Sequence, residues 1–153
     1  MTGGESEELE NGRAEELGGR YVAGETVELL LPPKVEYVPV LRAVVGVVAG
    51  TLSFNYDEII AIRVAVSEAL GLVLRHIQRE GLPGDSGGIK AGFVIGHDSL
   101  KVVLTAPGPG YVDTESAKDM ESQAVLESLV DSVEIGVEGS GERVITLVKY
   151  RGP

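Results

Sequence analysis

The segment from Tyr56 to Gly81 contains the longest run of helical periodicity in the chain. Apolar residues recur there every three or four positions, which places them on one wide face of a helix: Ile59, Ile62, Val66, Ala69, Val73 and Ile77. Acids open the segment and bases close it, as the helix dipole favours: Asp57, Glu58, Arg75, His76 and Arg79. The segment therefore predicts a long amphipathic helix against which the rest of the chain must pack.

A second row on the same helix contains a carboxylate among apolar side chains. Ala61, Ala65, Glu68 and Leu72 follow one another at helical spacing. Glu68 must therefore either reach solvent at the edge of a packed helix or lie in a lined pocket, because an unpaired buried carboxylate is unfavourable. Both interpretations stay open on the pattern alone.

The remaining segments predict one sheet covered by helices. We expect strands at 25–31, 89–96, 100–106, 132–138 and 142–151, and helices at 35–54, 56–81 and 114–131. Strands grouped around helices in this order predict an α/β two-layer sandwich, with a mixed or antiparallel sheet and its helices on one face. In the first helix, Gly46 and Gly50 are expected to let another element approach closely.

The helix at 114–131 carries a weaker pattern. Thr114 is a candidate N-cap. The expected apolar set is Ala117, Met120, Ala124, Leu126 and Leu129.

Composition bounds the organisation of the chain and the classes of partner. Residues 1–24 hold six glutamates, six glycines and few apolar side chains, so we expect a disordered acidic tail before one domain at 25–153. The net charge of −11 argues against binding to nucleic acids and anionic membranes, but is compatible with a basic protein partner. The absence of cysteine and of an apolar leader suits a cytoplasmic protein.

Neither histidine suggests a metal site. His76 falls near the end of a predicted helix, where it is interpreted as a partner of the terminal carbonyl groups. His97 falls in a predicted hairpin turn and is expected to be solvated. No acid pattern accompanies the two residues, and zinc sites need several converging ligands.

The stretch VAVSEALGLVLRHI, from Val64 to Ile77, resembles the N-box helix of the anti-sigma factor serine kinases. Those kinases belong to the histidine-kinase-like ATPase superfamily, whose structure is the Bergerat fold. The order of the predicted strands and helices also follows that family from about Val27 to Arg151. The resemblance therefore implies the histidine-kinase-like ATPase fold and a pocket for ATP and Mg²⁺ between the helices and a mobile lid.

The resemblance also implies roles at two positions of the N-box. Glu68 matches the glutamate that polarises the attacking hydroxyl group, as a general base would. One turn later the family has an asparagine that helps to hold Mg²⁺, and this chain has Leu72. Leucine offers no lone pair to an ion that demands oxygen ligands. The metal needed for phosphoryl transfer would therefore lack one of its ligands.

Two further family motifs are altered. The family has D-x-G-x-G after a strand, and its aspartate accepts a hydrogen bond from the amino group of adenine. Here the glycines stand at Gly108 and Gly110, but the aspartate position is Ala106. The phosphate-binding glycines of the next helix fall at Met120 and Ser122. Adenine acceptor, metal ligand and phosphate glycines are thus all missing, which predicts a degenerate site with no cofactor.

Three hypotheses follow. The first is an anti-sigma-factor-like regulator that acts by protein binding as a pseudokinase, with a sigma factor or an anti-anti-sigma protein as partner, a homodimeric state, and a docking surface around 36–51. The second is an active serine kinase that binds ATP and magnesium and uses Glu68. The third is a structural dimerisation domain of a signalling protein. The loss of the adenine acceptor, the metal ligand and the phosphate-binding glycines favours the first hypothesis over the second.

Overall fold

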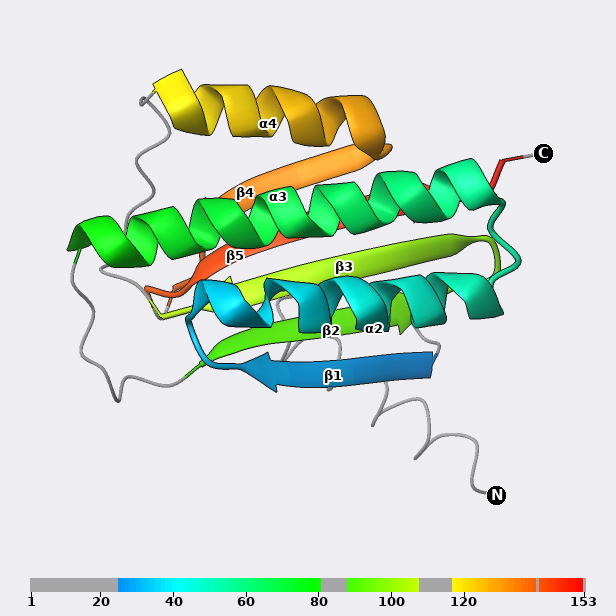
Figure 1. Cartoon of the computed structure of the whole chain (residues 1–153), viewed down its shortest axis with the longest axis horizontal. Coiled ribbons are helices and arrows are strands. Elements are labelled where there is room, and N and C mark those ends of the chain that lie inside the picture. The colour runs from blue at the N-terminus through cyan, green and yellow to red at the C-terminus, as the bar shows by residue number, and fades with distance from the viewer. Residues whose placement is uncertain (1–24, 81–87, 108–116, 140, 153) are drawn as a thin grey trace.

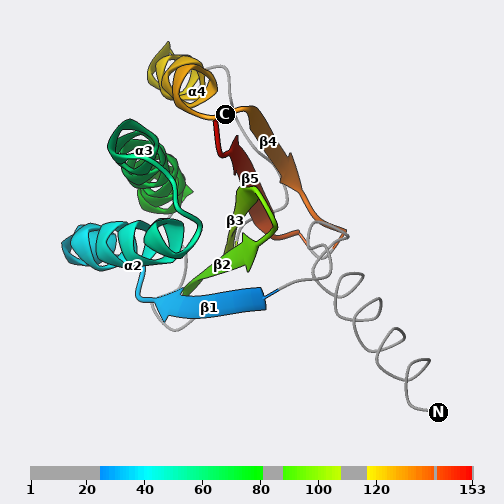
Figure 2. The same ribbon diagram turned by 90° about the vertical axis from the view of Figure 1, so that its right-hand side faces the viewer.

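The computed structural model of the chain describes residues 25–80, 88–107, 117–139 and 141–152. In this part of the chain, five strands form one sheet in the order β1-β2-β3-β5-β4, and every neighbouring pair is antiparallel. Three α-helices cover one face of that sheet (Figures 1 and 2). The elements are β1 (Glu25–Leu31), a 3₁₀ turn η1 (Val35–Tyr37), α2 (Val38–Thr51), α3 (Tyr56–Glu80), β2 (Ile89–Ile95), β3 (Ser99–Ala106), α4 (Ala117–Leu129), β4 (Ser132–Val137) and β5 (Arg143–Tyr150). The predicted two-layer sandwich is confirmed, with an antiparallel sheet.

The long helix α3 begins with a reciprocal cap. The side chain of Asn55 accepts a hydrogen bond from the backbone N–H of Glu58, and the Glu58 carboxylate accepts one from the backbone N–H of Asn55, both at 2.8 Å. This capping box satisfies N–H groups that the first turn leaves without helical partners. The Glu58 carboxylate also accepts a hydrogen bond from the backbone of Gly152. The first turn of α3 is thereby joined to the end of the chain.

Alternation along the strands builds the core between the two layers. In β5, Ile145 and Leu147 lie on the helix-covered face and are buried with Ile62, Val66 and Val73 of α3. The predicted apolar face of α3 is confirmed, with Ile59 and Ile77 packed at its margins. Arg143 occupies the inward position before Ile145, yet it is only 3% exposed. A charged residue therefore begins the inner row of β5, ahead of Ile145 and Leu147.

The first predicted helix is shorter than 35–54. Residues 35–37 form the 3₁₀ turn, Pro39 lies in the first turn of α2, and the helix ends at Thr51. Ser53 then adopts a positive φ of 58°, which an α-helix does not allow. The close approach expected at Gly46 is confirmed, because a Cβ there would lie 3.3 Å from Cδ of Arg63. The expectation at Gly50 is wrong, because nothing lies within 4 Å.

The apolar set predicted for the last helix is largely wrong. Ala117, Met120 and Ala124 are exposed, whereas α4 buries Asp119, Ser122 and Leu126. The physical reason is that α4 packs on α3 through polar side chains that find partners there. Thr114 and the tail at 1–24 lie outside the described residues. No helix within the described ranges is both long and apolar enough to span a membrane.

Candidate functional site

Polar side chains from α3 and α4 meet in one hydrogen-bonded cluster, called here the α3–α4 network. Its members are Glu68, Arg75, His76, Asp119 and Ser122. On α3, Glu68, Arg75 and His76 are separated by about two helical turns, which brings them to the side that faces α4. On α4, Asp119 and Ser122 are one turn apart and point back.

Ser122 is the centre of one arm of the network. Its hydroxyl group donates to Oε1 of Glu68 at 2.6 Å and accepts a hydrogen bond from Nη2 of Arg75 at 2.6 Å. The side chain is 2% exposed. A buried hydroxyl group is costly without partners, so both contacts help to hold α4 in place.

Asp119 is the centre of the other arm. Nε2 of His76 lies 3.0 Å from Oδ2 of Asp119, and Nη2 of Arg75 lies 3.5 Å from Oδ1. His76 and Asp119 are 2% and 3% exposed. An ionised carboxylate only accepts hydrogen bonds, so Nε2 carries the hydrogen of this pair. The expectation that His76 serves the end of the helix is therefore wrong, because Asp119 draws its ring into the interface between α3 and α4.

Glu68 lies at the edge of that interface and is half-buried. The sequence predicted either a solvent-exposed acid or an acid in a lined pocket, and neither describes Glu68 fully. Its carboxylate is hydrogen-bonded by Ser122, and it does not line the pocket described below. Its contact with Ser122 makes it a polar anchor between two helices.

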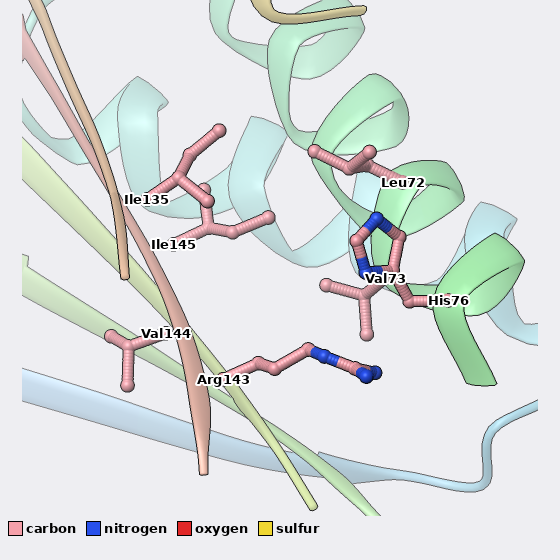
Figure 3. Close-up of a pocket in the computed structure, with 7 residues that line it drawn as sticks. All are labelled: Leu72, Val73, His76, Ile135, Arg143, Val144 and Ile145. Atoms are coloured by element: carbon pink, nitrogen blue, oxygen red, sulfur yellow. The ribbon is translucent and has the colours of Figure 1, made fainter. Parts of the chain in front are cut away.

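Leu72 lies one turn after Glu68 and is buried at 3% exposure. It lines a pocket between α3 and the strands β4 and β5, together with Val73, His76, Ile135, Arg143, Val144 and Ile145 (Figure 3). The pocket holds about 240 Å³ of empty space, part of it open solvent. The position that the resemblance assigns to a metal ligand thus presents an aliphatic wall.

Ala106 ends β3 and is 1% exposed. Its direct partner across the sheet is Arg143 of β5, on the same helix-covered face. A guanidinium group has only hydrogen-bond donors, and the amino group of adenine is also a donor. Arg143 therefore cannot replace the acceptor that an aspartate at Ala106 would supply.

The other predicted site residues separate in space. Ser122 belongs to the α3–α4 network, whereas Met120 is 60% exposed on the outer side of α4. Gly108 and Gly110 lie outside the described residues. His97 is exposed in the hairpin turn, as predicted. Among the described residues, no group of three or more histidine and acidic side chains is placed to hold a metal ion.

Sequence reasoning missed the partners that complete the site. Arg75, Asp119 and Arg143 were not singled out as members of one region. A signal existed for Arg143, because the alternation of β5 places it on the inner face. A signal also existed in α4, where Asp119 and Ser122 share the face of Leu126. The pairing between helices, however, depends on how α4 docks, which no local pattern specifies.

Comparison with known proteins places this geometry in context. The family model described as "Histidine kinase-like ATPase domain" matches residues 31–149. Relatives named serine-protein kinase RsbW come from Oceanobacillus iheyensis (34% identity over 60% of this chain and 56% of the relative), Halalkalibacterium halodurans (33%, 57% and 51%) and Bacillus pumilus (28%, 61% and 57%). The chain thus matches just over half the length of these relatives. They confirm the resemblance that the sequence of α3 predicted.

Two solved structures share the fold. One contains the RsbU and RsbW domains of a Mycobacterium tuberculosis protein, with a TM-score of 0.64, 19% identity, and coverage of 84% of this chain and 33% of that one. The other is the SiaB–SiaC complex from Pseudomonas aeruginosa, with a TM-score of 0.54, 9% identity, and coverage of 95% and 98%. At these identities the likeness concerns the fold alone.

Proposed function

The chain belongs to the histidine kinase-like ATPase family, and we propose that it acts as an anti-sigma-factor-like regulator by binding another protein, without kinase activity. Its relatives are named serine-protein kinases. The protein-binding role implied by the family and the phosphoryl-transfer chemistry of the site are therefore considered separately. The partner is a sigma factor or an anti-anti-sigma protein, and the working form is a homodimer.

One observation carries the loss of chemistry: apolar side chains stand at the metal and adenine positions. Leu72 and Ala106 are 3% and 1% exposed, so water does not readily supply the missing ligands there. Arg143 beside Ala106 adds a donor where an acceptor is required. The would-be base Glu68 is hydrogen-bonded by Ser122. Together these features disfavour ATP, Mg²⁺ and phosphoryl transfer.

The outer surface of α2 supports the protein-binding role. Val40 and Val47 are 42% and 73% exposed, and Val35 before them is 66% exposed. These residues fall within or beside the stretch 36–51 that the family resemblance suggests for docking. Val40 and Val47 are two helical turns apart and so share one side of α2, and exposed apolar side chains grouped in this way favour association with another protein. The net charge of −11 favours a partner with a basic rim.

Calorimetry with ATP tests the loss of chemistry. The full chain is titrated with ATP, with and without Mg²⁺, beside the RsbW relative from Bacillus pumilus as a positive control. We expect heat of binding from the relative alone. Micromolar binding by this chain would overturn the proposal and favour the second candidate, an active serine kinase that uses Glu68. ATP-dependent transfer to a partner serine, abolished by Glu68→Gln, would establish that candidate.

A matched pair of surface variants tests the protein-binding role. Val47→Asp places a charge on the exposed side of α2, and Met120→Asp places one on α4, where the side chain is also more than half exposed. We expect Val47→Asp to weaken capture of sigma factors or their antagonists from the same host, with Met120→Asp unchanged. If the wild type captures neither class yet forms a stable dimer, a structural dimerisation domain is the better description.

A further inference from the structure

The face of the sheet opposite the helices contains a second apolar cluster. Val102 and Leu104 of β3 belong to the core under the helices, so Val103 between them points to the other face, called here the open face. There it clusters with Val94 of β2 and Val144 of β5, and the three valines are only 1% to 3% exposed. Figure 2 shows α2, α3 and α4 on one side of the sheet, so no helix in the described part of the chain covers this cluster.

Neighbouring side chains within the sheet do not account for that burial. The direct partner of Val103 on β2 is Gly92, and the direct partner of Val144 on β4 is Gly136. Glycine has no side chain to lay over a neighbour, so each valine lacks a shield on one side. Burial of both valines to 3% exposure therefore requires a further layer across the middle of the open face.

A polar atom on the same face indicates that this layer is a peptide. Thr146 is the direct partner of Val103 on β5 and is 5% exposed. Its Oγ1 atom has no hydrogen-bond partner among the described residues, although buried polar atoms are nearly always paired. A backbone that crosses the sheet offers both N–H and C=O groups to a hydroxyl group, which can donate and accept. An apolar floor with one hydroxyl group therefore fits a peptide segment with apolar side chains.

We propose that residues 17–24 fold back over the open face and bury Tyr21 and Val22 against Val103 and Val144. All six glutamates of 1–24 lie within 5–16, whereas 17–24 read LGGRYVAG and contain no acid. The composition of 1–24 as a whole predicts disorder, because the segment cannot bury enough apolar surface by itself. Docking of its last third on a preformed apolar face supplies that burial, while the acidic residues before it remain in solvent.

The charges of the open face favour the same part of the chain. Four charged side chains share the face, two of each sign, and each is exposed or half-buried: Glu28, Lys90, Lys101 and Glu134. The face therefore carries no net charge from these residues and gives an acidic segment no advantage. Apolar contact decides what covers the centre, which favours 17–24 over 5–16.

The length of 17–24 and the place where it ends also fit the open face. The segment leads directly into β1, which begins at Glu25 on the edge of the sheet. Neighbouring strands lie about 4.8 Å apart, so β3 is about 10 Å from β1 and β5 is about 14 Å away. An extended chain spans about 3.3 Å per residue, so Tyr21 can lie about 13 Å from Glu25. Tyr21 and Val22 can therefore reach the strands that hold the buried valines.

Thiol alkylation tests the proposal directly, because the chain has no cysteine of its own. Val103→Cys places a thiol on the open face, and Val102→Cys places one on the helix-covered face at the preceding residue of β3. Each variant is made in the full chain, alone and together with Tyr21→Asp, which puts a charge on the covering segment. We expect Tyr21→Asp to speed alkylation of Val103→Cys by iodoacetamide about tenfold or more and to leave Val102→Cys slow, because buried thiols are inert.

Leu9→Asp is the matched control, because it places the same charge within the acidic part of the tail and should leave the rate at Val103→Cys unchanged. Rapid alkylation of Val103→Cys without Tyr21→Asp would show an uncovered face and overturn the proposal. A slow rate that Tyr21→Asp does not change, or that Leu9→Asp raises equally, would also overturn it. A rate that rises as the protein is diluted would assign the cover to a second copy of the chain instead.

Hydrogen exchange on the wild-type chain keeps the test decisive if a cysteine variant fails to fold. We expect the backbone N–H groups of 17–24 to exchange about tenfold or more slowly than those of 1–16. Equally rapid exchange throughout 1–24 would overturn the proposal. Neither readout involves ATP or a sigma factor, so this inference and the proposed function can fail separately.

Discussion

Glu58 and Glu68 lie on the same helix, and they are held in different ways. Glu58 accepts hydrogen bonds from the backbone N–H groups of Asn55, three residues before it, and of Gly152, near the end of the chain. Glu68 accepts its bond from the side chain of Ser122 on another helix. The first arrangement depends mainly on local sequence, whereas the second depends on tertiary packing. Helix α3 therefore carries one acid that caps its first turn and another that joins its middle to α4.

The largest expected effect comes from the buried end of the α3–α4 network. Asp119→Ala leaves the ring of His76 and the guanidinium group of Arg75 without the carboxylate that they share. We expect the free energy of unfolding to fall by about 3 kcal/mol, because removing one partner from a buried ion pair strands the other. Urea denaturation measures the change. Glu121→Ala, on the exposed side of α4, should change stability by less than about 0.5 kcal/mol, and equal losses would contradict the network.

Ser122→Ala tests the arm of the network that holds Glu68. The variant removes the hydroxyl group that donates a hydrogen bond to Glu68 and accepts one from Arg75, each at 2.6 Å. Both side chains then lose a hydrogen-bond partner. The expected loss is about 2 kcal/mol, since a stranded polar group costs more than the average hydrogen bond. The control is Ser128→Ala, because Ser128 is exposed on the same helix and donates its hydrogen bond to a backbone carbonyl of its own turn. A loss no larger than that of the control would show that Glu68 is not anchored by Ser122.

Glu58→Ala moves the comparison to the start of α3. It removes the carboxylate of the capping box, and we expect a loss of about 1 kcal/mol, as measured for other helix caps. Asp57→Ala, in the same first turn, is the control, because it changes the interaction with the helix dipole alone. Thermal unfolding of both variants gives the difference. A larger loss of stability from Asp57→Ala than from Glu58→Ala would contradict the role of Glu58 in the cap.

The smallest expected effect is a dependence on pH at Glu58. Hydrogen bonds from the backbone of Asn55, and then of Gly152, lower the pKa of this carboxyl group from its ordinary value of 4.5. A lowered folded-state pKa contributes stability above the unfolded value, and that contribution is lost as the pH falls through the folded value. The difference in unfolding free energy between the wild type and Glu58→Gln should therefore be constant above about pH 5.5 and shrink below pH 4.5. A difference that grows on acidification would contradict the sign.

The sequence was sufficient for those parts of the fold that follow from local periodicity. The apolar face of α3 repeats every three or four residues, and the strands alternate, so both were predicted close to their observed bounds. The start of α2 differed because residues 35–37 form a 3₁₀ turn before the helix proper. Such terminal differences arise because helix ends depend on caps and not on hydrophobic pattern.

The site was less predictable, for a physical reason that Asp119 illustrates. No local pattern predicts its burial, which depends on the positions of Arg75 and His76 on a distant segment. Leu72 and Ala106 were identified by position in a family motif, but the pairing of Ala106 with Arg143 required the register of β3 against β5. Local patterns describe faces of elements, and only docking decides which faces meet.

The place of β1 in the sheet has a consequence for how the chain reaches its native state. β1 pairs with β2 along its full length, yet all of α2 and α3 separates the two strands in the sequence. The β2–β3 and β4–β5 pairs, by contrast, are joined by short turns. Closing a long loop costs more chain entropy than closing a short one, and contacts of high sequence separation slow folding. The edge strand that begins the domain is thus expected to join last as the chain folds, after the two helices that follow it have found the sheet.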